Sequence, residues 1–180
     1  MTLFATLLVA GLIVAPAVGQ CSVTTTFAGG NGAGGNMFDV MALTDLTITG
    51  FDVNISGSPQ MEVWYRQGTY LGFENSSAGW TQAGNTIQVT SNGVGVPTPL
   101  TGLGASIFIP AGQIFRLHVT TVAGSMTYSN GSVQGALFAQ NGDLQIFEGH
   151  GGSYFNQTNV PRVWNGAIYY NPAVGLYANF

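Results

Sequence analysis

Charge is the scarcest feature of this sequence. Charged residues make up 6% of its 180 residues, against about 25% in an ordinary globular domain. The basic residues are Arg66, Arg116 and Arg162, and lysine is absent. Three arginines cannot form the stripe of cations that neutralises a phosphate backbone, so we do not expect nucleic acid as a partner. The absence of lysine also excludes Schiff-base chemistry and a lysine general base.

Cysteine is nearly absent too. Cys21 is the single cysteine, so no intramolecular disulfide can form, and packing and hydrogen bonds must hold the domain together. The three residues before it, Val18, Gly19 and Gln20, resemble a lipoprotein box, but glutamine stands where such a box needs a small residue. Lipidation of Cys21 is therefore disfavoured.

Basic residues are also missing from the N-terminal apolar run. Residues 1–19 are almost entirely apolar and contain small residues at the spacing of a cleavage site. This predicts a signal peptide over 1–19 and a secreted or cell-surface protein. The run is nearer to signal length than to the roughly 20 residues of a membrane span. Because no Lys or Arg precedes it, an uncleaved membrane anchor is the competing interpretation, and it is the one membrane contact that we expect.

Helical periodicity is lacking after this leader, whereas strand periodicity is clear. Between Asp39 and Arg66, apolar and polar residues alternate with period two, which is typical of half-buried strands. The apolar phase moves from even to odd positions across Gly50, which predicts a β-bulge there. The residues from Ser56 to Pro59 predict the turn that sends the next strand back.

The same alternation recurs along the rest of the chain. In a predicted strand from Ile114 to Val122, Arg116 and His118 share the face opposite the apolar residues. Gly and Asn turns separate about nine or ten short strands at intervals of about 8 to 12 residues, which indicates an antiparallel sandwich or barrel. We predict an all-β fold, an antiparallel β-sandwich that is jelly-roll-like.

The predicted organisation is a single domain between two dissimilar ends. Residues 20–35 are glycine-rich and predict a flexible segment, residues 36–170 form the β-sandwich domain, and residues 171–180 form a C-terminal tail or an added strand. The stretch from Gly149 to Gly152 reads as a connection between strands.

Several segments together are similar to a known module. The segments ITGFDVNI, VWYRQGTYLGFE and PRVWNGAIYY resemble a module that recurs in secreted and surface proteins of environmental bacteria, and the likeness extends from Thr24 to Tyr170. The resemblance implies an extracellular β-sandwich that is often an appendage of larger proteins. It implies no activity.

Metal-binding and catalytic signatures are weak. Glu148 and His150 stand two residues apart, so an extended segment would project both from one face, and with Asp143 they form a candidate divalent metal site or acid/base pair. A solvent-facing strand end is the alternative interpretation. Asn141, Gly142 and Asp143 suit either a structural calcium ion or a plain hairpin turn.

No catalytic constellation emerges from the remaining residues. Nothing in the spacing of the seven acidic residues selects the carboxylate pair of a glycosidase, and no Gly-x-Ser-x-Gly elbow occurs. We therefore expect no enzymatic activity and no cofactor other than the calcium ion considered above.

Aromatic residues offer the stronger binding hypothesis. Trp64 and Arg66 lie on the strand face opposite Met61 and Val63, so they point outward if the latter form the core. Exposed aromatics with amide neighbours suit a neutral glycan, whereas large aromatics are mostly buried, which for each tryptophan singly favours a place in the core. The candidate ligand-binding residues are Trp64, Arg66, Tyr70, Trp80 and Tyr154. Trp164 is assigned to structure.

Self-assembly is the alternative function. An almost uncharged surface lacks the lysines that keep edge strands from pairing, and the alternating tail that ends at Phe180 is suited to join a neighbouring sheet. The sequence thus predicts a non-catalytic binding or adhesion module for an extracellular glycan or surface polymer, with a self-associating filament, sheath or coat subunit as the alternative. The sequons at Asn54, Asn75, Asn130 and Asn156 matter only in a eukaryotic secretory pathway.

Overall fold

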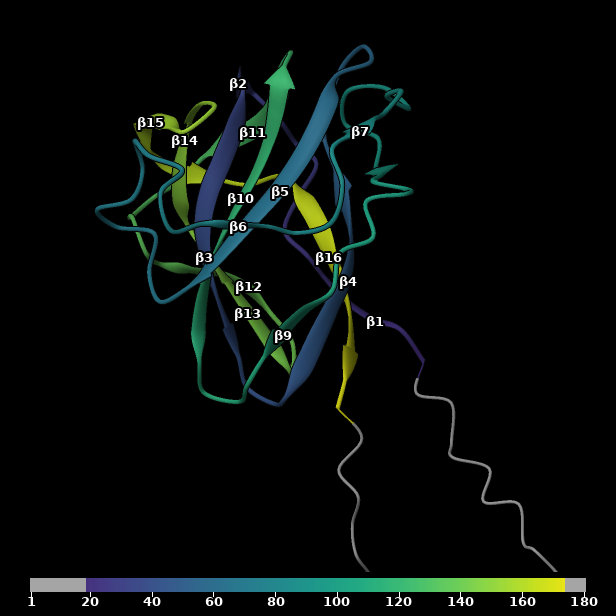
Figure 1. Cartoon of the computed structure of the whole chain (residues 1–180). Coiled ribbons are helices and arrows are strands. Elements are labelled where there is room, and N and C mark those ends of the chain that lie inside the picture. Colours follow the sequence, from purple (N-terminus) through teal and green to yellow (C-terminus); the bar gives the residue numbers. More distant parts are fainter. Residues whose placement is uncertain (1–18, 174–180) are drawn as a thin grey trace, which may run out of the picture.

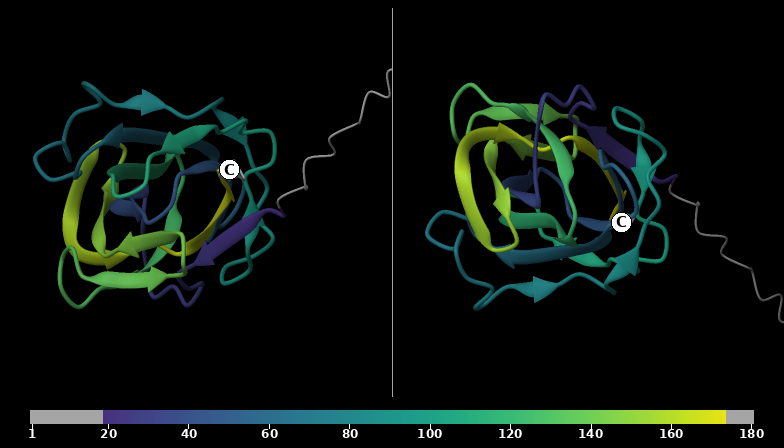
Figure 2. Two further views of the ribbon diagram at one scale, coloured as in Figure 1. Left: turned by 90° about the horizontal axis from the view of Figure 1, so that it is seen from below. Right: turned by 90° about the horizontal axis from the view of Figure 1, so that it is seen from above.

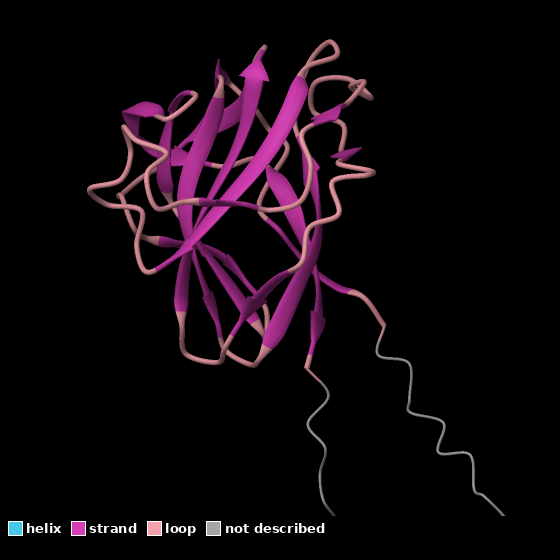
Figure 3. Ribbon diagram, in the orientation of Figure 1, coloured by secondary structure: helices cyan, strands magenta, loops and turns pink. Residues whose placement is uncertain are grey.

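The protein is an all-β sandwich. The computed structural model describes residues 19–173, and within this range no residue is helical, so no segment there forms a helix that would span a membrane (Figure 3). Two antiparallel sheets lie in two layers, which confirms the predicted fold class (Figure 1). The views from below and above show the layers on opposite sides of the core (Figure 2). The predicted signal peptide lies almost entirely outside the described residues.

The smaller sheet has five strands. Its order is β1-β16-β4-β8, and β9 also pairs with β4. The strands are β1 (Cys21–Thr24), β16 (Gly166–Pro172), β4 (Leu46–Val53), β8 (Thr98–Pro99) and β9 (Ile107–Ile109).

The larger sheet has eleven strands and contains the longest strand of the described residues, β10. Its main order is β2-β11-β15-β14-β3-β10-β5-β6. In addition, β13 pairs with β3, β12 pairs with β13 and β7 pairs with β5. The bounds are β2 (Asn31–Ala33), β3 (Gly35–Ala42), β5 (Gln60–Gln67), β6 (Thr81–Gln82), β7 (Ile87–Gln88), β10 (Ile114–Ala123), β11 (Met126–Asn130), β12 (Leu137–Gln140), β13 (Leu144–Phe147), β14 (Gly149–Ser153) and β15 (Asn156–Val163).

Alternating residues on both sheets supply the core between them. Along β4 the side chains of Leu46, Ile48, Phe51 and Val53 are buried, and the bulge at Gly50 keeps the last two on the inner face. The bulge is confirmed by the register, because Tyr169 pairs with Gly50 whereas Tyr170 pairs with Ile48.

Trp164 lies at the centre of this core. It is almost fully buried and stacks on Phe38 with ring centroids 4.8 Å apart. The assignment of Trp164 to structure is therefore confirmed.

Two expectations about glycine-rich segments differ from the structure. The segment 20–35 contains β1 and β2, and both pair with neighbouring strands. Gly149–Ser153 is not a connection but β14, which lies between β3 and β15. A Cβ at Gly149 would collide with the carbonyl oxygen of Met37, so glycine allows the close approach of backbones that pairing requires.

One connection between strands and the C-terminal boundary of the domain also differ from the predictions. The turn from Ser56 to Pro59 does not return the chain as a hairpin, because it leads from β4 in the smaller sheet to β5 in the larger sheet. At the C-terminus, β16 continues to Pro172, so the domain extends two residues beyond the predicted boundary. The predicted tail from residue 174 onward lies outside the described residues.

Candidate functional site

The outer face of the larger sheet, which points away from the core, carries four of the side chains whose direction the sequence predicted. On β10 and β5 the register places His118 opposite Trp64 and Arg116 opposite Arg66. Their neighbours Met61 and Val63 are fully buried in the core, whereas Trp64 and Arg66 are half-buried on the other side. The outward orientation predicted for Trp64 and Arg66, and the face that Arg116 shares with His118, are therefore confirmed.

Two loops cover this outer face. Residues 68–86, a loop that includes the two-residue strand β6, cross it after β5, and residues 153–157, the turn from β14 into β15 with its flanking residues, pack against Trp64. Tyr70 and Trp80 in the first loop are 2% and 7% exposed and pack with Met37 and Phe155 into one apolar cluster. We call this region the covered face. The expectation that Tyr70 and Trp80 are exposed to a ligand is therefore wrong, because both rings are used to attach the loop to the sheet.

The carboxylate of Glu62 fastens both loops. It accepts hydrogen bonds from Trp64 Nε1 at 2.9 Å, from Tyr154 OH at 2.8 Å and from Thr86 Oγ1 at 2.7 Å. Burial, together with the negative charge of Glu62, raises the pKa of Tyr154 to about 12. Tyr154 keeps an exposed edge, but its hydroxyl and the indole N–H of Trp64 are both occupied within the protein.

The two arginines of the covered face stack on Phe73 of the covering loop. Their guanidinium carbons lie 3.9 Å (Arg66) and 4.2 Å (Arg116) from the ring centroid. Arg116 also donates from Nη2 to the carbonyl oxygen of Gln67 at 2.6 Å. Burial and the nearby charge of Arg66 lower the pKa of Arg116, whereas Asp39 opposes that shift. Arg66 thus holds a loop in place rather than facing a free ligand.

His118 lies at the centre of the covered face and is fully buried. The ring of Phe155 packs edge-on against it at 4.7 Å between centroids. Burial lowers the pKa of His118 to about 3, so the imidazole is neutral at physiological pH.

The three residues of the predicted metal site do not come together. Glu148 accepts hydrogen bonds from Ser132 and Val133, Asp143 accepts them from Thr44 and Tyr170, and His150 packs against the ring of Tyr70. Between residues 19 and 173, no three His, Cys, Asp or Glu side chains lie close enough to hold a metal ion. The two-residue spacing of Glu148 and His150 does not pair them, because Glu148 falls between β13 and β14.

The candidate calcium ligands also have internal partners. Asn141 Oδ1 accepts hydrogen bonds from the backbone N–H groups of Asp143 and Leu144. This arrangement is the side-chain turn that asparagine commonly forms, and it connects β12 to β13 as a hairpin.

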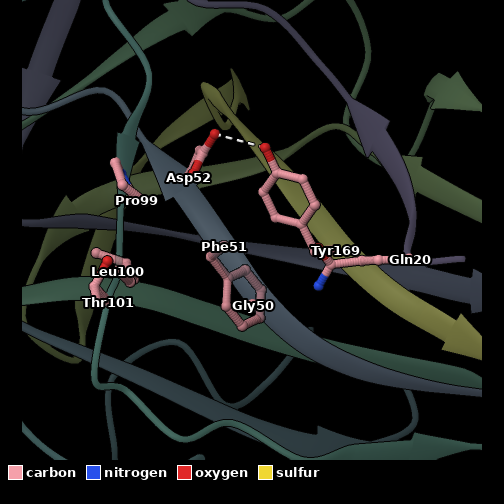
Figure 4. A pocket seen from close by; sticks show the side chains of 8 residues that line it. All are labelled: Gln20, Gly50, Phe51, Asp52, Pro99, Leu100, Thr101 and Tyr169. Carbon is pink, nitrogen blue, oxygen red and sulfur yellow. Dashed lines mark hydrogen bonds between the residues drawn. The ribbon is translucent and has the colours of Figure 1, made fainter.

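The outer face of the smaller sheet is different, because it carries an open groove. The groove has a volume of about 490 Å³, and its lining includes Gln20, Gly50, Asp52, Pro99, Thr101 and Tyr169 (Figure 4). β4 and β16 form its floor and one wall, and the segment from Pro99 to Thr101 forms the opposite wall. We call it the Tyr169 groove. A second hollow of about 250 Å³ also borders Pro99 and Thr101, so the two hollows flank this segment.

One hydrogen bond organises the Tyr169 groove. Tyr169 OH donates to Asp52 Oδ2 at 2.8 Å (Figure 4), and this bond raises the pKa of Tyr169, with a smaller contribution from burial. Within residues 19–173, Asp52 Oδ1 makes no side-chain hydrogen bond. The groove thus combines a half-buried aromatic ring, a free carboxylate oxygen and exposed hydroxyl and amide groups.

Sequence reasoning missed this groove, although two signals for it existed. Asp52 lies between inward-facing Phe51 and Val53, so its outward direction follows from the same alternation that predicted β4. Gly50 in the bulge leaves space beside the ring of Tyr169, since a Cβ there would meet only that side chain, at 3.8 Å. What the sequence lacked was the pairing of β16 with β4, which brings Tyr169 to Gly50.

Comparison with known proteins assigns no family or function to the chain. No protein-family model matches the chain, and no curated protein is significantly similar to it.

Proposed function

We propose that this protein is a non-catalytic extracellular binding module that holds a glycan in the Tyr169 groove. One observation carries the proposal. The outer face of the smaller sheet offers an accessible aromatic ring beside a free carboxylate oxygen, whereas the aromatics of the larger sheet are covered by loops. The apolar face of a sugar ring packs on an aromatic side chain, and its hydroxyls donate to acceptors such as a carboxylate.

The composition of the groove supports binding rather than cleavage. Glycoside hydrolysis requires two carboxylates on either side of the scissile bond, and Asp52 is the one carboxylate that lines the groove. The hollows on both sides of Pro99 and Thr101 suit an extended chain of sugars rather than a single one.

The proposal is tested by retention of the protein on a panel of immobilised glycans. Two variants alter the groove. Tyr169→Ala removes the stacking ring, and Gly50→Val fills the space beside it. Gly50 does not have a positive φ, and a Cβ there meets Tyr169 only at ordinary van der Waals distance, so Gly50→Val should block the groove without disturbing the fold. Gly142→Val is the matched control, because a Cβ at Gly142 meets nothing within 4 Å.

We expect wild type and Gly142→Val to be retained equally by at least one glycan. Retention should fall about fivefold in Tyr169→Ala, since stacking of one ring contributes on the order of 1 kcal/mol. Wild-type protein that binds no glycan on the panel, or binding that survives both groove variants, would contradict the proposal.

Self-assembly is a second candidate, favoured by one edge of the larger sheet. β12 pairs with β13 alone, and Leu137 and Phe138 on it are 44% and 40% exposed. An exposed apolar edge strand favours pairing with another chain. Light scattering at rising concentration tests this candidate. If β12 mediates assembly, ordered polymers form and Phe138→Lys abolishes them, whereas wild-type protein that stays monomeric rejects it.

A further inference from the structure

The side chains that line the Tyr169 groove carry one negative charge and no positive charge. Asp52 is the one charged residue among those that line it. The three arginines of the chain all belong to the larger sheet, Arg66 to β5, Arg116 to β10 and Arg162 to β15. The five strands of the smaller sheet therefore contain no basic residue, and no side chain of that sheet neutralises Asp52.

The hydrogen bonds of Asp52 leave room for a donor from a ligand. Tyr169 occupies Oδ2, and Oδ1 receives no side-chain hydrogen bond within the described part of the chain. An ionised carboxylate can only accept hydrogen bonds, so a ligand group that reaches Oδ1 must be a donor. Asp52 is half-buried, which limits its screening by solvent relative to a fully exposed carboxylate.

The ring of Tyr169 also favours a positively charged ligand. The face of an aromatic ring attracts cations, and tyrosine does so when the cation lies within about 6 Å of the ring centre. The hydroxyl of this ring is bonded to Asp52, so the ring and the carboxylate border the same part of the groove (Figure 4). A protonated amine placed there interacts favourably with both groups.

We propose that the Tyr169 groove selects amino sugars whose amines are free and protonated, such as chains of β-linked glucosamine, over N-acetylated or uncharged sugars. This inference rests on the proposed glycan-binding function and names the sugar class. N-acetylation removes the charge and lengthens the substituent, so it weakens both the ion pair with Asp52 and the cation–π contact with Tyr169. The net charge of −4 attracts cationic chains to any part of the surface, so the test must separate the groove from this general attraction.

The experiment measures the affinity of the full chain for three tetrasaccharides by calorimetry. They are β-linked tetramers of glucosamine, N-acetylglucosamine and glucose, compared at a pH where the amines are protonated and at two salt concentrations. We expect glucosamine to bind about tenfold more tightly than the other two, because one exposed ion pair and one cation–π contact each contribute a factor of a few. The preference should shrink at high salt.

Two variants with the same change in charge separate the groove from the rest of the surface. Asp52→Asn keeps an oxygen that can accept the hydrogen bond of Tyr169 and should abolish the preference, so that the glucosamine tetramer binds no more tightly than the other two tetramers. Glu74→Gln removes one negative charge from the covering loop of the larger sheet, where Glu74 is half-buried, and should leave the preference unchanged.

Each outcome decides between the two proposals. Equal affinity of wild type for the three tetramers would overturn the inference and leave glycan binding in place. An equal loss of preference in Glu74→Gln and Asp52→Asn would also overturn it, since the attraction would then be general. If wild type binds none of the three tetramers and none of the immobilised glycans, the proposed function itself fails.

Discussion

The outer faces of the two sheets differ in how accessible they are: loops cover that of the larger sheet, whereas that of the smaller sheet carries an open groove. On the larger sheet, residues 68–86 and 153–157 cover the face and bury Trp80, His118 and most of the remaining aromatic surface. On the smaller sheet, Tyr169 and Asp52 border an open groove. The face with more aromatic residues is therefore the less accessible one. An aromatic side chain that points away from the core indicates a binding site only if no loop packs on it.

Most of the charged side chains on the covered face contact the loops that cover it. Both Arg66 and Arg116 stack on Phe73, and Glu62 accepts hydrogen bonds from Trp64, Thr86 and Tyr154. On the covered face, charge is used to fasten loops to the sheet. In the groove, the carboxylate of Asp52 keeps one oxygen free for a ligand.

The largest expected effect is a loss of stability at the covered face. Trp80→Ala should lower the free energy of unfolding by about 3 to 5 kcal/mol, because it leaves a cavity between Phe155, His118 and the sheet. Urea denaturation checks this value. The glycan affinity of the folded fraction should be unchanged, and a loss of affinity without a loss of stability would contradict the division between the two faces.

Acid should weaken the covered face through His118. Burial lowers its pKa from 6.5 to about 3, so between these values the unfolded chain binds one more proton than the folded chain. Stability is therefore complete above pH 6.5 and falls as the pH drops, by about 1.4 kcal/mol per pH unit. The loss between about pH 6.5 and pH 4.5 amounts to roughly 2 kcal/mol.

Urea denaturation of wild type and His118→Gln at these two pH values measures this contribution. The variant should lose less stability on acidification, since it lacks the titrating imidazole, while the contributions of other groups, including His150, remain in both proteins. Identical losses in the two proteins would show that His118 is accessible to protons in the folded state.

A smaller loss of stability is expected when the hydrogen bond between Tyr154 and Glu62, which holds residues 153–157, is removed. Tyr154→Phe removes the hydrogen bond to Glu62, although Trp64 and Thr86 still donate to that carboxylate. The free energy of unfolding should fall by about 1 kcal/mol. Amide hydrogen exchange should become faster in residues 153–157 and stay unchanged in β16. An unchanged exchange rate in the loop would mean that this bond does not hold it.

The smallest effect is expected for an aromatic residue of the smaller sheet. Phe108 on β9 is 54% exposed on the outer side, so Phe108→Ala should change the free energy of unfolding by no more than about 0.5 kcal/mol. Urea denaturation alongside Trp80→Ala makes the comparison direct. A loss above about 2 kcal/mol would show that this face is also covered.

The sequence predicted which way side chains point but not what lies above them. Alternation placed Trp64 and Arg66 outward on β5, and the phase change at Gly50 predicted the bulge, because both signals are local. The burial of Tyr70 and Trp80 depends on contacts with β3 and β10, which are distant in the sequence. No periodicity in the loop itself reports such contacts.

The missed elements share a different cause. β14 consists largely of glycines, so it has no alternation of side chains to detect, although its pairing depends on that absence. The Tyr169 groove joins β16 to β4, two strands far apart in the chain. Individual residues such as Asp52 were predictable as outward-facing, whereas their assembly into a groove required the strand order.

Mapping a bound glycan by NMR tests the division between the two faces most directly. Backbone amide shifts of the labelled chain would be followed during titration with the tightest-binding tetrasaccharide. We expect the perturbed amides to lie in β4 and β16 and near Gln20 and Thr101, around the groove. Perturbations centred on Trp64, Tyr70, Trp80 and Tyr154, with none around Tyr169, would show that the ligand reaches the covered face and would contradict this account.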